Sequence, residues 1–93
     1  MKDFNDVRSQ IIGITVQAEL DIEKCADLHR SSKMVYKMYS DKQVYLEGIF
    51  DMAKFIVEDE NTLNDCKLIQ LYQFTCSSLR CAVNNVIVKY NCK

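Results

Sequence analysis

Residues 4–28, FNDVRSQIIGITVQAELDIEKCADL, decide the fold class of this chain. Their apolar residues recur every three or four positions, and on a helix that spacing forms one apolar side. The spacing does not fit the two-residue alternation of a half-buried strand, so it predicts a long amphipathic helix. The recurring residues are Phe4, Val7, Ile11, Ile14, Ala18, Cys25 and Leu28.

This first helix has a second apolar edge. Ile12, Val16 and Leu20 follow each other at four-residue intervals beside the main apolar side. A helix that is apolar over such a wide arc has more surface to bury than a simple two-helix contact requires. We therefore expect it to pack centrally in the fold.

The rest of the chain extends the helical pattern. Its 93 residues include no proline and two glycines, although folds with many tight turns draw on both residue types. A chain of this length holds one domain, which we expect to span residues 1–93. The composition therefore predicts an all-α fold, a compact bundle of three long helices with antiparallel neighbours.

Capping signals predict where the helices begin. Ser40 and Gln43 have the spacing of a capping box, which predicts a helix start at Ser40. Residues 28–39 then either continue the first helix or form a helix of their own after Ser31 and Ser32. A break near Ser31 and Ser32 could thus raise the number of helices to four.

The last helix is expected to begin at Thr62, after the polar residues 58–61. Apolar residues then recur at helical spacing towards the end of the chain. Residues 83–90 either remain helical or form a hairpin, because Asn84 and Asn85 could occupy a turn between β-branched residues. We favour the helix, since the turn contains no glycine and the apolar spacing continues.

Acidic and basic residues alternate by segment, although the net charge is only −1. Residues 1–28 and 47–65 are rich in acids, whereas residues 29–46 and 66–93 are basic. Antiparallel packing places such segments beside each other, and each exposed ion pair contributes about 0.2–1 kcal/mol. We interpret the alternation as complementarity between packed helices.

The sequence offers little material for catalysis or for a cofactor. Gly13 and Gly48 lie too far apart to form a phosphate-binding loop, and His29 is the single histidine. No two of the five cysteines have the spacing of two to four residues that is common in zinc sites. We therefore expect no enzyme activity, no cofactor, no metal site and reduced thiols.

Hydrophobic runs along the chain are short. Lys, Arg, Asp or Glu interrupts each run before it reaches the roughly 18 residues that a membrane-spanning helix needs. Residues 1–6 carry two acids and lack the basic and apolar layout of a secretory signal. We expect a cytoplasmic protein that does not enter a membrane.

The middle basic segment could face a polyanion. Arg30, Lys33 and Lys37 lie at positions i, i+3 and i+7, which puts three cations on one side of a helix. Tyr36 and Tyr39 are interleaved with them. Cations mixed with aromatic residues are typical of surfaces that contact nucleic acid.

The same segment carries a resemblance to a known family. Residues 31–46, SSKMVYKMYSDKQVYL, resemble the recognition helix and the following helix of a helix-turn-helix regulator of the TetR type. The resemblance implies that Ser31 opens the recognition helix, residues 31–39, and that Val35 is its buried position. It also implies backbone contacts for Tyr36 and Lys42 and solvent-facing positions for Lys33 and Lys37.

Two functions follow from these patterns. We favour a non-enzymatic helical interaction module, an adaptor, inhibitor or immunity-type protein that binds an unidentified protein partner, its own copy or both. The alternative is a DNA-binding transcriptional regulator. The first interpretation rests on aromatic residues, which are enriched in protein contact surfaces and are numerous here: Tyr36, Tyr39, Tyr45, Phe50, Phe55, Tyr72 and Phe74.

Self-association is expected through the last helix. This helix is apolar on more than one side, and a chain of this size gains stability when it buries further surface against a copy. We expect a homodimer or a higher oligomer. The predicted seam consists of Leu71, Phe74, Leu79, Val83 and Ile87.

Overall fold

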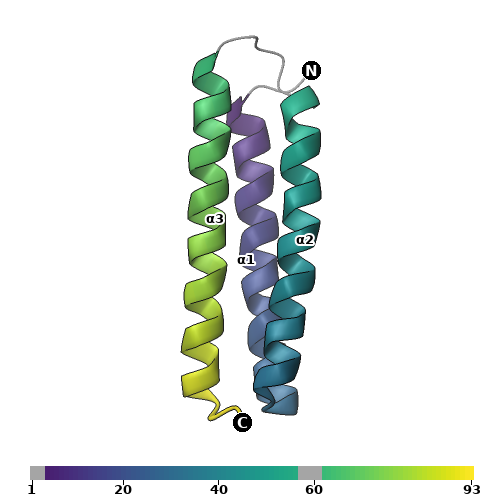
Figure 1. Cartoon of the computed structure of the whole chain (residues 1–93), viewed down its shortest axis with the longest axis vertical. Coiled ribbons are helices and arrows are strands. Elements are labelled where there is room, and N and C mark those ends of the chain that lie inside the picture. The colour runs from purple at the N-terminus through teal and green to yellow at the C-terminus, as the bar shows by residue number, and fades with distance from the viewer. Residues whose placement is uncertain (1–3, 57–61) are drawn as a thin grey trace.

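Three long helices form the protein (Figure 1). The computed structural model describes residues 4–56 and 62–93, in which α1 spans Phe4–His29, α2 spans Ser32–Ile56 and α3 spans Thr62–Lys89. The helices form a rod of 47 × 18 × 17 Å. Because α2 runs antiparallel to both neighbours, α1 and α3 are parallel (Figure 1). The predicted all-α bundle of three helices is confirmed.

The boundary between α1 and α2 lies at Arg30 and Ser31. Arg30 has a φ of 50°, and its N–H donates a hydrogen bond of 2.9 Å to the carbonyl of Ala26. A left-handed residue with this bond commonly ends a helix. The hydroxyl of Ser31 then accepts a hydrogen bond of 3.3 Å from the N–H of Met34, as an N-cap does. The break near Ser31 and Ser32 is therefore present. It separates α1 from α2 and creates no fourth helix.

The helix start predicted at Ser40 is wrong. α2 continues without interruption through Ser40, which is exposed, while Val35, Leu46 and Phe50, on another side of the helix, are buried. A capping residue contributes about 1 kcal/mol, whereas burying one such side chain contributes about 1.5–3 kcal/mol. The continuous apolar side therefore outweighs the local capping signal.

The last helix begins at Thr62 as predicted and remains helical through Asn84 and Asn85. The hairpin considered for residues 83–90 is not formed. The expected connection at residues 58–61 lies outside the described part of the chain.

The chain after α3 folds back onto the turn between α1 and α2. The N–H of Lys93 donates to the carbonyl of Arg30 at 3.1 Å, and the carbonyl of Lys93 accepts from the N–H of Ser32 at 2.8 Å. The guanidinium of Arg30 also lies 5.6 Å from the centre of the Tyr90 ring. This end of the bundle is thus closed by all three helices.

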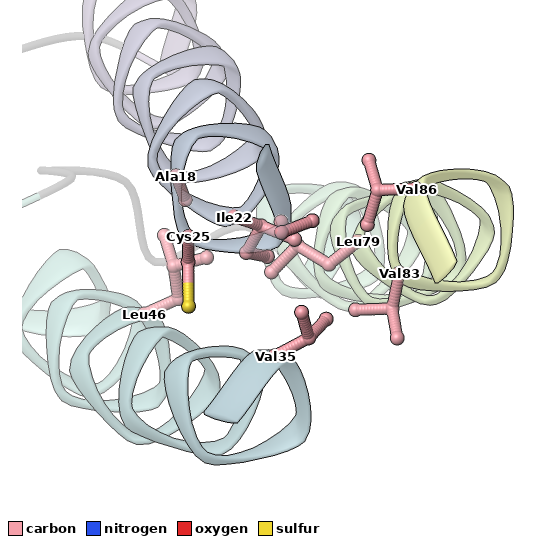
Figure 2. Packing of buried hydrophobic residues seen from close by; sticks show 9 residues of the cluster. Ala18, Ile22, Cys25, Val35, Leu46, Leu79, Val83 and Val86 are labelled. Carbon is pink, nitrogen blue, oxygen red and sulfur yellow. The ribbon is translucent and has the colours of Figure 1, made fainter. Parts of the chain in front are cut away.

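The core runs along the rod in two clusters. Near the α1–α2 turn, Ile22 of α1, Val35 of α2 and Leu79 of α3 converge, as Figure 2 shows. Ile49 packs against both clusters. The second cluster consists of Val7, Ile11, Phe50, Ala53, Leu68 and Leu71.

One residue expected on the buried side of α1 lies outside the core. Leu28 is 78% exposed, whereas Ile22 is fully buried. At 3.6 residues per turn, Leu28 is rotated by about 120° from Ile22 around the helix axis. The apolar side predicted for residues 4–28 is therefore correct along most of its length and wrong at Leu28.

Across the described residues, no helix combines the length and the hydropathy needed to cross a bilayer.

Candidate interaction surface

The five residues of the predicted seam do not share an exposed surface. Leu71, Leu79 and Val83 are buried, and Ile87 packs against the core. Phe74 alone among the five is exposed, at 62%. The predicted seam is therefore wrong for the three buried residues. α3 contacts both α1 and α2, so its second apolar side is buried inside the bundle.

Two of the predicted DNA contacts are engaged within the bundle. The ammonium of Lys42 lies 2.7 Å from a carboxylate oxygen of Asp21 on α1. Arg30 lies in the α1–α2 turn, where its guanidinium is 3.4 Å from the carboxylate of Asp27 and stacks over Tyr90. Both cations therefore have partners that belong to this chain.

The other three, Lys33, Tyr36 and Lys37, are exposed on α2, and Lys37 lies 3.7 Å from Asp41. The predicted recognition helix is not a separate element, because α2 continues to Ile56 and lies antiparallel along α1. A helix-turn-helix unit instead crosses its helices at about 90–120°. The described residues thus do not form the unit that the resemblance implies.

An exposed apolar strip runs along the groove between α1 and α3. Val16 and Leu20 are each about half exposed and line a hollow of about 310 Å³. Ile12, one turn before Val16, lines a neighbouring hollow of about 540 Å³ together with Phe74 of α3. We call Ile12, Val16, Leu20 and Phe74 the α1–α3 strip.

Charges of opposite sign mark the two ends of the strip. Arg8 and Lys67 line the hollow that contains Phe74, and the ammonium of Lys67 lies 5.4 Å from the centre of the Phe4 ring. Glu19, Glu23 and Lys89 line the other hollow, where the two carboxylates outnumber the one ammonium. The strip therefore has a basic end and an acidic end.

Hydrogen bonds hold the acidic end in place. Glu19 accepts one from the hydroxyl of Ser78. Glu23 accepts one of 2.8 Å from the ammonium of Lys89 and one of 2.9 Å from the hydroxyl of Tyr90. These two bonds, chiefly the one from Lys89, hold the pKa of Glu23 below its usual value. Glu23 is therefore ionised at neutral pH, and both glutamates tie α1 to α3.

Tyr72 of α3 has a raised pKa because its hydroxyl has a partner on α2. The hydroxyl of Tyr72 donates a hydrogen bond of 3.0 Å to Glu47, and this bond, with a smaller effect of burial, raises the pKa of Tyr72 to about 12.

The five cysteines are free thiols, and burial raises the pKa of Cys25. Within residues 4–56 and 62–93, no three or more His, Cys, Asp or Glu side chains are grouped to hold a metal ion.

The sequence contained the signal for the strip. The second apolar edge of the first helix is made of Ile12, Val16 and Leu20. The structure leaves Val16 and Leu20 half exposed, whereas central packing would have covered them.

The chain matches no protein-family model, no curated protein and no solved structure.

Proposed function

We propose that this protein is a non-enzymatic interaction module that associates with a second copy of itself through the α1–α3 strip. The observation that supports the proposal is the exposed Phe74, which shares a hollow with Ile12, while Val16 and Leu20 are half exposed one and two turns further along α1. A few aromatic residues often dominate the binding free energy of an interface. Covering a side chain such as Phe74 contributes about 1.5–3 kcal/mol.

The charges at the ends of the strip favour a copy of this chain in the antiparallel orientation. That orientation places the basic end, Arg8 and Lys67, near the partner's acidic end, Glu19 and Glu23. The attraction is softened by Lys89, which already pairs with Glu23. Charges at the rim of an interface mainly set orientation and association rate, and apolar contact supplies the affinity.

Sedimentation equilibrium tests the proposal. The unmodified chain is expected to form dimers, and Phe74→Ser is expected to raise the dissociation constant at least about tenfold, which corresponds to 1.4 kcal/mol. Val88→Ser is the matched control, because Val88 is exposed on the same helix but lines neither hollow of the strip. A monomer of 10.8 kDa at millimolar concentration, or equal effects of the two variants, would overturn the proposal.

A further inference from the structure

A third hollow, of about 540 Å³, lies between α1 and α2 near their connecting turn. Four of the side chains that line it carry soft or borderline donor atoms: Cys25, His29, Met34 and Met38. Cys25 is buried, Met38 is half-buried, and Met34 and His29 are more exposed. Figure 2 shows the sulfur of Cys25 pointing from α1 towards α2.

The alignment of α1 and α2 brings these donors to matching heights. The ion pair between Asp21 and Lys42 marks one level of the antiparallel pair. One step of four residues from each towards the turn reaches Cys25 and Met38, and a second step reaches His29 and Met34. Each step is about one helical turn of 5.4 Å. This alignment places Cys25 level with Met38 and His29 level with Met34, on two successive turns of the helix pair.

The chemistry of this set is specific. Thiolate and thioether sulfur select soft ions such as Cu(I), and imidazole also binds copper. Hard ions such as Mg²⁺ and Ca²⁺ require oxygen ligands. The two carboxylates at this hollow already face cations, because Asp21 pairs with Lys42, and Asp41 pairs with Lys37. Lys37 and Lys24 also line the hollow, and their ammonium groups carry no free electron pair for a metal ion. The donors that remain available to an ion are therefore three sulfur atoms and one imidazole.

We propose that this hollow is a Cu(I) site whose ligands are drawn from Cys25, His29, Met34 and Met38. Binding replaces the proton of the Cys25 thiol with the metal ion, and that proton passes to solvent. The two thioethers and the neutral imidazole bind without losing a proton. Copper remains in the Cu(I) state throughout, so no electron is transferred. The site is independent of self-association, because the α1–α3 strip lies on other residues.

Anaerobic titration of the full chain with Cu(I), against a chromophoric Cu(I) chelator, measures the affinity. One tight equivalent is expected. Removing residues that merely support metal ligands changes affinity by about 10–100-fold, so Met34→Leu combined with Met38→Leu should weaken binding at least about tenfold. Leucine conserves the packing volume of methionine. Met52→Leu is the matched control, because Met52 is exposed on α2 outside this hollow.

Methyl NMR of the unmodified chain gives a second readout that needs no variant. The sequence contains four methionines, and one equivalent of Cu(I) is expected to shift the methyl signals of Met34 and Met38 but not that of Met52. Unshifted Met34 and Met38 signals would overturn the proposal. So would tight binding that survives the double leucine variant or that is lost when the exposed Cys66 and Cys81 are replaced by serine.

Discussion

The ammonium of Lys42 on α2 lies 2.7 Å from a carboxylate oxygen of Asp21 on α1. Both side chains are more than two-thirds covered. The hydrogen bond from Lys42, assisted by one from Gln17, holds the pKa of Asp21 below its usual value of 3.8. This pair joins an acid-rich segment to a basic one, as the alternation of charge along the sequence predicts.

Asp21→Asn is expected to lower the free energy of unfolding by about 0.5–1 kcal/mol at pH 7. Because the pKa of Asp21 is lower in the folded chain than in the unfolded one, the stabilisation is complete above about pH 4 and disappears as the pH falls through the folded value. Urea titrations of the two proteins should therefore converge in acid. A difference that stays constant down to pH 2 would contradict this account.

Ile22→Ala is expected to lower the free energy of unfolding by about 2–5 kcal/mol, because it opens a cavity among tightly packed side chains. Leu28→Ala, on the same helix, is expected to change it by less than about 0.5 kcal/mol, since Leu28 is exposed. Chemical denaturation followed by circular dichroism measures both. Similar losses in the two variants would mean that α1 is rotated differently in the bundle.

Gly48→Ala is expected to raise the free energy of unfolding by about 0.5–1 kcal/mol, because alanine costs less entropy than glycine inside a helix. A Cβ at Gly48 would meet no atom of its surroundings within 4 Å, and the same holds at Gly13. Gly13→Ala should therefore stabilise the chain to a similar degree. Thermal melts compare the two, and a loss of stability in either variant would reveal a close contact that a single chain does not contain.

Arg30→Gly is expected to be more stable than Arg30→Ala by about 1 kcal/mol, because glycine adopts a positive φ without the strain that a Cβ introduces. Both variants lack the guanidinium and its contacts with Asp27 and Tyr90, so their difference isolates the backbone at φ 50°. Urea unfolding of the two is the measurement. If the alanine variant were equally stable, the turn would have to leave the left-handed conformation without cost.

The sequence predicts the helices better than it predicts what they contact. Apolar spacing identifies α1 and α3 because burial of one side repeats over many turns. Ser40 misleads because a capping signal is local, and it is overridden by the burial of Val35 and Leu46 on either side of it. Leu79 and Val83 are predicted to contact a second copy for a different reason. The sequence of an apolar helix side does not distinguish a neighbour in the same chain from a neighbour in another chain.

Side chains that meet across helices are the hardest to predict. Cys25 and His29 lie four residues apart in the sequence, but this pair alone supplies only two ligands. Met34 and Met38 join them at one hollow only because α1 and α2 are aligned at the level of the Asp21–Lys42 pair. That alignment depends on a turn whose geometry rests on Arg30 in an uncommon conformation, which apolar spacing does not reveal.

Because the bundle has three helices, Phe4 at the start of α1 and Lys93 lie at opposite ends of the long axis of the rod (Figure 1). A force applied between these two residues pulls α1 and α3 in opposite directions along their shared interface. The contacts between them then bear the load together, as in shear, and do not open one after another as in unzipping. The bundle should accordingly resist this force better than a force that pulls α1 and α3 apart from one end.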